Sequence, residues 1–542
     1  MGTQPRGSLR QDSPAVCGLS FGEKLLGGKG GYMKITTFAA IYIGSYEVSL
    51  KIFELSPRKP LRVIDHVRAR VELGRDAYQK DMIGYELMDE LGKVLGEYQK
   101  IMREYKVDDY VAYAGGVFRD IKNQQFVLDQ LKIRTGIEIL VLGNSEHRFI
   151  SYKSVAFRKE FDEMTRQGAA VVDLGGESLQ VTLFVEGKVV TTQHLVLGTM
   201  RLNEMFSTFS GYLSHYEDQI EELVNKDLEV FKSLYMKNVK IKYVIIMGDY
   251  VTELMKKTEK KSDYIVSSEK FVKSMRKFYK KNLDQIAMEL NLSNDKDPLL
   301  IPYIVLYTRI VEELNAEEIW IPGANISEGI AYDYAEKNHI IKPEHSFEED
   351  ILSAAKSLSR RYQSYSPHID ALTQMVTLVF DALKKVHGLS GRERLLLQVA
   401  AILHDCGKYV SMARGPECAY NIIMESEIIG LSHLEREIVA STVLYNTYPL
   451  DDYEAVADRL DQVSYVIVAK LAAILRVSNA MDRSHKQKFK NVKAVVKEKE
   501  LVITIDSVDD IILERGLFYV KAGFFESVFG IRPVIREKRV YK

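Results

Sequence analysis

Two short glycine-containing turns carry the residues best suited to binding a phosphoryl group. The first lies in YIGSYE, where an apolar run ends at Gly44 and Ser45, and the second lies in DLGGESLQ, with Gly175, Gly176 and Ser178. Glycines let backbone N–H groups approach a phosphate without interference from a Cβ, and successive N–H groups form an anion-binding nest. One such turn would be typical of an ordinary β-hairpin. Two related turns, about 130 residues apart, instead indicate a duplicated framework that binds phosphate across one cleft.

Asp173 ends the apolar run AAVVDL just before the second turn. A carboxylate at this place suits a hydrated divalent ion that bridges to phosphate oxygens, which is the usual manner of Mg²⁺ binding. Aspartate also initiates turns without any ligand, and that alternative stays open on this residue alone. Beside two phosphate turns, however, Asp173 is predicted to be a ligand of Mg²⁺ or Mn²⁺.

Composition limits the classes of partner. The 542 residues carry 74 Lys+Arg against 75 Asp+Glu, a net charge of -1, which excludes a global electrostatic footprint for nucleic acid or an anionic membrane. The longest apolar runs, such as LLLQVAAIL, are shorter than the roughly 18 residues of a membrane span. Three cysteines exclude a disulfide framework and a four-cysteine zinc site, so a cytoplasmic setting is expected. A polyanion therefore needs a local site. The basic stretch over 256–281 could steer a polyanion toward that site, or it could be the solvated face of a charged helix.

The elements that must position the two turns follow from hydrophobic periodicity. Two β-rich runs begin just after Met33, helices and short strands alternate behind them, and a second strand pair repeats the layout. This alternation predicts an α/β fold with two lobes. From about Ile351 to His485 the periodicity is almost wholly helical. The predicted parts are a disordered extension over 1–33, α/β lobes over 34–165 and 166–340, a helical domain over 341–486 and a small α+β tail over 487–542.

Several spaced motifs resemble those of the exopolyphosphatase/guanosine pentaphosphate phosphatase (Ppx/GppA) family. AAIYIGSYE is similar to the family's first phosphate motif and DLGGESLQ to its second, while GGVFRDIKN and LGNSEHRFISY correspond to two stretches between them. The passages LGTMRLNEMF and IWIPGANISEGIAYDY occupy the places of later Gly-containing motifs. Because no single short motif is decisive, the resemblance rests on their agreement in order.

The resemblance implies a two-lobed actin-like ATPase (ribonuclease H-like) fold and a hydrolase that releases terminal phosphate from inorganic polyphosphate or guanosine pentaphosphate. It places Glu146 on the family's general base and Arg119 on a phosphate-binding arginine, whose planar guanidinium suits a pair of phosphate oxygens. Spacing alone would make Glu146 a first-turn helical residue favoured by the helix dipole, and Arg119 a surface ion-pair residue. The family also implies a homodimer, and two-fold dimers are the commonest assembly.

Three residues depart from the family pattern near the expected ion. Tyr42 stands where the first motif has Asp, Glu177 replaces a glycine of the second motif, and Gln180 replaces a Glu that supports the metal. The turn IMGDYVTEL also keeps a single glycine. These departures leave a second hypothesis open, a non-catalytic or weakly active regulator that binds polyphosphate or a guanosine alarmone. A sugar or acetate kinase is disfavoured because the glycines around residue 248 are few.

The helical region resembles an HD domain, which is named for adjacent His and Asp metal ligands. His404 and Asp405 form the pair in ILHDCGKYV, and His368 in YSPHIDAL takes an earlier histidine position. An imidazole and a carboxylate together suit a divalent ion. Asn479 stands where a closing Asp is expected, and Cys418 and Asn446 replace further histidines. A structural or regulatory domain is therefore favoured over a second hydrolase, with these three residues as a possible metal site.

Overall fold

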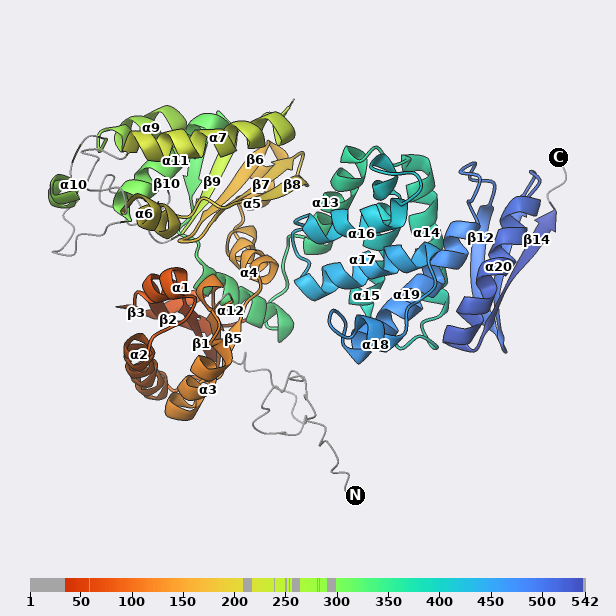
Figure 1. Cartoon of the computed structure of the whole chain (residues 1–542), viewed down its shortest axis with the longest axis horizontal. Coiled ribbons are helices and arrows are strands. Elements are labelled where there is room, and N and C mark those ends of the chain that lie inside the picture. Colours follow the sequence, from red (N-terminus) through yellow and green to blue (C-terminus); the bar gives the residue numbers. More distant parts are fainter. Residues whose placement is uncertain are drawn as a thin grey trace, which may run out of the picture.

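The computed structural model describes the greater part of the chain in four successive parts (Figure 1). The described residues are 35–57, 59–119, 121–207, 217–237, 239–248, 251–252, 254–255, 264–279, 281, 283–289 and 299–539. The predicted extension over 1–33 lies outside them, as do 256–263 of the basic stretch.

The first lobe is a five-stranded sheet in the order β3-β2-β1-β4-β5. β1 to β3 are antiparallel, whereas β4 and β5 join β1 in parallel. Their bounds are β1 Thr36–Ile43, β2 Glu47–Leu55, β3 Arg62–Arg70, β4 Asp109–Ala114 and β5 Ile139–Val141. The lobe's helices are α1 Leu73–Lys80, α2 Tyr85–Glu104, η1 Gly116–Phe118, α3 Gln124–Thr135 and α4 Asn144–Ala156. α2 buries a stripe at helical spacing, formed by Leu87, Leu91, Leu95, Tyr98 and Met102.

The second lobe repeats this layout in the sheet order β10-β11-β9-β6-β7-β8. Again three antiparallel strands stand beside parallel ones, with β10 antiparallel at the far edge. The strands are β6 Ala169–Leu174, β7 Leu179–Val185, β8 Lys188–Leu195, β9 Tyr243–Met247, β10 Tyr264–Ser267 and β11 Glu318–Ile321. The helices are α5 Phe161–Arg166, α6 Thr199–Ser207, α7 Glu217–Tyr235, α9 Ser268–Arg276, α10 Leu283–Glu289 and α11 Leu300–Leu314. The expected two-lobed actin-like fold is confirmed.

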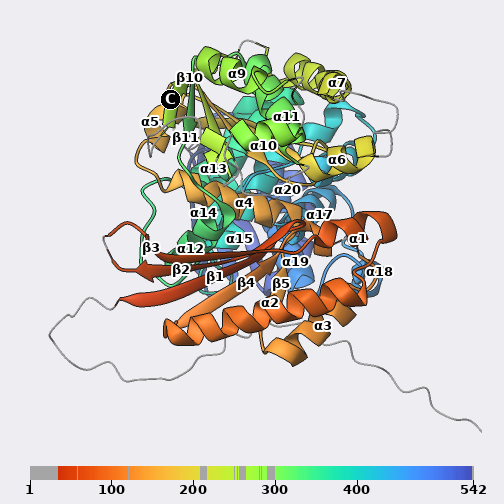
Figure 2. The same ribbon diagram turned by 90° about the vertical axis from the view of Figure 1, so that its left-hand side faces the viewer.

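The lobes are joined where α4 crosses α12 (Ile326–Lys337) (Figures 1 and 2). A buried ion pair helps to hold them, because Lys51 Nζ of β2 lies 3.2 Å from Glu328 Oε1 of α12. The helices approach so closely that a Cβ on Gly329 would lie 1.9 Å from the carbonyl oxygen of Ile150. A glycine is therefore required at this crossing.

The Gly329→Ala variant is expected to lose about 1–3 kcal/mol of unfolding free energy, because the new methyl group overpacks a backbone contact. The matched control is Gly96→Ala in α2, where a Cβ meets nothing within 4 Å. That change should stabilise the protein by about 0.5–1 kcal/mol through helix propensity. Denaturant unfolding of both variants measures the difference, and equal midpoints would contradict the close approach at Gly329.

The third part is all-α. Its helices are α13 Phe347–Arg361, α14 Ser366–Ala382, α15 Gly391–Leu403, η2 Cys406–Tyr409, α16 Gly415–Glu425, α17 His433–Thr447, α18 Tyr453–Val456 and α19 Gln462–Ala480. Ser390 and Ser432 form capping boxes with the glutamates three residues later, which defines where α15 and α17 begin. Among the described helices, α19 alone is long and apolar enough to cross a membrane, yet it packs against α14, α15, α17 and α20 as a core helix.

The tail is a three-stranded sheet, β12-β13-β14, covered by α20. Its elements are β12 Lys490–Lys497, β13 Glu500–Ser507, α20 Ile512–Phe529 and β14 Arg532–Arg539. α20 links the parallel strands β13 and β14 and also packs against α19. One continuous apolar core runs from the second lobe through the helical part into this sheet. The tail is therefore packed onto the helical part through buried apolar side chains.

Candidate functional site

The two glycine turns are structurally equivalent. In the first turn, the N–H of Gly44 donates to the carbonyl oxygen of Glu47 at 2.9 Å. In the second turn, the N–H of Gly175 donates to the carbonyl oxygen of Ser178, also at 2.9 Å. Each turn connects the first two strands of its lobe's sheet, with Ile43 opposite Val48 and Leu174 opposite Leu179. Tyr42 and Asp173 consequently occupy matching positions, two residues before the first glycine of each turn.

The turns meet across the cleft between the lobes. A Cβ on Gly176 would lie 2.6 Å from the Ser45 hydroxyl oxygen, so any larger residue would force the Ser45 side chain to move. Backbone N–H groups at the start of α6 donate to the Gly176 carbonyl and hold the second turn in place. The cleft has a volume of about 360 Å³ and is lined by both turns. Gly44, Ser45, Asp173, Gly175 and Gly176 border this cavity, and Ser178 and Arg119 border a smaller one beside it.

Tyr42 fills the position equivalent to Asp173 and bonds a histidine. Its hydroxyl lies 2.8 Å from His147 Nε2. Burial, with help from the Arg119 and Arg148 charges, lowers the pKa of His147 to about 3, while burial beside Asp173 raises the pKa of Tyr42. The imidazole is therefore neutral at pH 7, and it shares a hydrogen bond with the Tyr42 hydroxyl. This pair contributes no negative charge to the cleft.

Asp173 is the acidic group that faces both turns. Burial raises its pKa, although a hydrogen bond from Ser151 and the charge of Arg148 lower it in part. Gln180 lies directly opposite Asp173 in the β6–β7 ladder, and its buried Oε1 has no hydrogen-bond partner among the described residues. A half-buried carboxylate beside a buried, unpartnered amide oxygen is a donor set that fits a hard divalent cation. Both side chains border the cleft.

Arg119 is occupied by a carboxylate of the second turn. Its Nη2 lies 3.2 Å from Glu177 Oε2, and the Tyr78 hydroxyl donates to Glu177 Oε1 at 3.0 Å. Both members of the ion pair are largely buried, at 20% and 24% side-chain exposure. Two strong donors therefore converge on one anionic group at the edge of the cleft. The arrangement is suited to an anion, and Glu177 supplies one from the chain itself.

Glu146 does not line either cavity of the cleft. The residue lies at the start of α4, is exposed, and its Oε2 accepts a hydrogen bond from the N–H of Gly143 at 2.8 Å. This is the helix-capping geometry that spacing alone suggested. On the same helix, Asn144, His147, Arg148 and Ser151 face the cleft instead.

Arg148 connects the cleft to the helical part of the chain. Its guanidinium is buried and lies 2.9 Å from Glu427 Oε1, in the loop between α16 and α17. The other oxygen of Glu427 accepts from the Ser145 hydroxyl at 3.3 Å. Sequence reasoning missed this contact because 279 residues separate the two charges, and neither lies in a recognisable motif.

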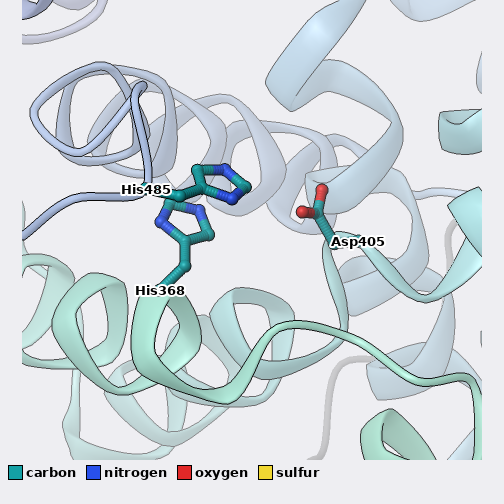
Figure 3. A group of neighbouring side chains, drawn as sticks. All are labelled: His368, Asp405 and His485. Atoms are coloured by element: carbon teal, nitrogen blue, oxygen red, sulfur yellow. The ribbon is translucent and has the colours of Figure 1, made fainter.

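A second cluster of polar side chains lies inside the helical part. The structure brings His368, His404 and Asp405 together, with His368 Nε2 at 3.2 Å from His404 Nε2 and His404 Nε2 at 3.2 Å from Asp405 Oδ1. His485 stacks on His368 and was not predicted as part of this group, although it lies in the quoted stretch DRSHKQKF. Ligand atoms of His368, Asp405 and His485 all lie within 4.8 Å of one another (Figure 3).

Comparison with protein families gives two matches. The model described as the Ppx/GppA phosphatase family matches residues 52–338, which is more than half of the chain. The model described as Ppx/GppA phosphatase, domain III, matches residues 352–518.

Curated relatives match a shorter region. A protein named guanosine-5'-triphosphate,3'-diphosphate pyrophosphatase from Aeromonas hydrophila is 26% identical over 203 residues, 36% of this chain and 38% of the relative. Its namesake from Aeromonas salmonicida is 24% identical over 197 residues, with the same coverage. The chain thus spans about two fifths of the length of the curated relatives it matches.

Two solved structures are similar. One is an Aquifex aeolicus member of the Ppx/GppA protein family, with 20% identity and a TM-score of 0.48, covering 58% of this chain and 100% of its own. The other is an exopolyphosphatase from Cytophaga hutchinsonii, with 16% identity and a TM-score of 0.47, covering 57% of this chain and 100% of its own.

Proposed function

Because the chain belongs to the Ppx/GppA phosphatase family, we propose that it hydrolyses phosphoanhydrides and releases terminal phosphate from inorganic polyphosphate or guanosine pentaphosphate. The single observation that carries the proposal is the convergence of two equivalent glycine turns on the half-buried carboxylate of Asp173. A protein whose net charge is only -1 needs such a local site to bind a polyphosphate. We place the reaction in the cytoplasm, on the grounds of cysteine usage, and expect a homodimer.

The chain's own residues would bind and orient the terminal phosphoryl group. Gly44, Gly175 and Gly176 would let a phosphoryl group approach the turns without a Cβ in the way, while the N–H groups of Gly44 and Gly175 close the turns themselves. The Ser45 and Ser178 hydroxyls add neutral donors. Phosphoryl transfer depends mainly on positioning and on stabilising charge, which is what this cleft supplies. Mg²⁺ or Mn²⁺ held by Asp173 and Gln180 would offset the charge that develops on the phosphate oxygens.

The water-activating base is a separate part of the proposal. The family resemblance assigns it to Glu146, whose carboxylate here caps α4 at 2.8 Å from the Gly143 nitrogen. Glu146 would have to leave this cap to reach a water in the cleft. Glutamine at the same place can keep the capping bond, because its side-chain oxygen accepts equally well, but it cannot take a proton.

We expect the wild-type chain to release phosphate from one of the two substrates with Mg²⁺ or Mn²⁺, and Glu146→Gln to do so about 10²- to 10⁴-fold more slowly, the usual contribution of a general base. Phosphate release is measured with both substrates and with chelator as a blank. Glu146→Ala, which also loses the cap, separates chemistry from helix stability. Equal rates in wild type and Glu146→Gln would remove Glu146 as the base.

A non-catalytic binding protein is the second candidate. Two observations favour it, namely Tyr42 in place of a second carboxylate and Glu177 on the guanidinium of Arg119. Tight polyphosphate binding without turnover, across Mg²⁺ and Mn²⁺, would support this candidate and contradict hydrolysis.

A further inference from the structure

Arg148 is a buried cation of the cleft with an unused hydrogen-bond donor. Its side chain is 6% exposed and borders the smaller cavity together with Gly175, Gly176 and Ser178 of the second turn. Nη1 forms the ion pair with Glu427, whereas Nη2 is buried and has no hydrogen-bond partner among the described residues. Leaving a buried, charged donor unpaired is costly. Nη2 is therefore suited to an anionic acceptor that enters this cavity.

Arg148 differs in this respect from Arg119, which borders the same cavity. Arg119 Nη2 lies 3.2 Å from Glu177 of the second turn, so a phosphate must displace that carboxylate to reach it. The counter-ion of Arg148 lies in the loop between α16 and α17 and borders neither cavity of the cleft. A phosphate can thus approach Arg148 Nη2 without displacing a carboxylate of the chain.

Glu427 fixes the direction of the Arg148 side chain through both of its carboxylate oxygens. Oε1 lies 2.9 Å from Arg148 Nη1, and Oε2 accepts from the Ser145 hydroxyl at 3.3 Å. Residues 145 and 148 are three apart on α4, so one carboxylate contacts two neighbouring positions of the same helix face. The loop is held in turn, because Arg436 Nη1 donates to the carbonyl oxygen of Ser426 at 3.1 Å. Glu427 is thus a fixed point against which the guanidinium is oriented.

The surroundings of Glu427 leave Arg148 as its cation. A separate cavity of about 570 Å³, between the second lobe and the helical part, is lined by Glu427 and by His194 of β8. Burial, and to a lesser extent the charge of Arg148, lowers the pKa of His194 to about 4. The His194 imidazole is therefore neutral at pH 7 and does not compete with Arg148 for the carboxylate.

We propose that Arg148 binds a phosphoryl oxygen of the substrate through Nη2, and that Glu427 of the helical part is the positioning residue that holds the guanidinium for this contact. The inference rests on the proposed function, since it requires that the cleft receives a phosphate chain. One guanidinium can serve both groups, because its N–H donors point in fixed and separate directions. Phosphate affinity in the cleft between the lobes then depends on a residue outside the lobes.

The test measures binding of methylenediphosphonate to the full chain with Mg²⁺ by calorimetry. The P–C–P bridge of this diphosphate analogue is not hydrolysed, so binding is read without turnover. We expect Arg148→Lys, which keeps the charge but loses the planar fork, to weaken binding about 10- to 100-fold, as for loss of a charged hydrogen bond. Glu427→Ala should weaken it by a similar factor. Glu427→Gln should bind within a few fold of wild type, because its amide oxygen still accepts from Nη1.

Glu425→Ala is the matched control, because Glu425 is an exposed glutamate that lines the 570 Å³ cavity and neither cavity of the cleft. It should bind the analogue like wild type. The double variant Arg148→Lys/Glu427→Ala should bind no more weakly than Arg148→Lys, since Glu427 acts through the guanidinium.

Unchanged binding in Arg148→Lys, equal losses in Glu427→Ala and Glu427→Gln, or fully additive losses in the double variant would each overturn the proposal. Additive losses would show a general disturbance of the fold and not an effect on Arg148. The expected pattern of binding, without phosphate release from polyphosphate or guanosine pentaphosphate, would contradict the proposed hydrolysis and still support these roles of Arg148 and Glu427.

Discussion

The Asp173→Asn variant is expected to release phosphate about 100-fold more slowly than wild type, or slower still, because among the described residues Asp173 is the carboxylate that borders both cavities of the cleft. Asparagine keeps the size of the side chain and its ability to accept from Ser151. The change therefore tests charge and not packing. Burial raises the pKa of Asp173, and a nearby cation, such as the Arg148 guanidinium, favours the ionised form.

The measurement is phosphate release as a function of Mg²⁺ and Mn²⁺ concentration. The variant's remaining activity should need a higher concentration of either ion than wild type. Asp129→Asn is the control, since Asp129 is an exposed aspartate on α3 and lies outside both cavities. Activity of Asp173→Asn within a few fold of that control would show that the cleft works without this carboxylate.

The second large effect concerns Glu177, whose carboxylate accepts hydrogen bonds from the Arg119 guanidinium and the Tyr78 hydroxyl. We expect Glu177→Gln to lower KM for polyphosphate about tenfold, which corresponds to about 1.4 kcal/mol. A phosphate that reaches Arg119 must displace a charge-assisted bond of 3.2 Å and also enter beside a like charge. Glutamine keeps the shape of the side chain but removes the repulsion. Glu177→Gly, which gives the turn the glycine of the family motif, should act in the same direction.

A double-mutant cycle with Arg119→Ala sharpens this test. If Glu177 competes with substrate for Arg119, its removal should help much less once the guanidinium is gone. Steady-state kinetics on the four proteins gives the coupling. A rise in KM for Glu177→Gln, together with a weaker response to Mg²⁺, would instead identify Glu177 as a group that supports the ion.

Local chemistry explains what could be predicted from the sequence. The turns at Gly44 and Gly175 are set by a few neighbouring residues, and the repeated strand pairs follow from periodicity, so the fold and the meeting of the turns were predictable. The family is confirmed by the match over residues 52–338. The roles of individual residues in the cleft and the domain boundaries stay predictions.

Contacts between distant segments could not be predicted. Nothing near Glu177 in the sequence shows that its carboxylate meets Arg119 and Tyr78, because these pairs form only when the lobes close on each other. The capping position of Glu146, by contrast, could be predicted, because the capping bond joins residues close in sequence and their spacing alone favoured it. His485 was not predicted because the HD-domain motif has a carboxylate at the position of Asn479. The imidazole that stacks on His368 instead comes from the segment that follows α19.

Because Arg148 forms an ion pair with Glu427, the net charge beside the cleft depends on a side chain from the helical part of the chain. A guanidinium at 6% exposure is costly to bury without a counter-ion, and this counter-ion comes from a loop more than 270 residues later in the chain. A shortened protein that ends before α13 would lack Glu427. The Arg148 guanidinium would then be buried beside the cleft without this counter-ion. The charge beside the cleft is therefore set by the lobes and the helical part together, because Glu427 of the helical part pairs with Arg148 of the first lobe.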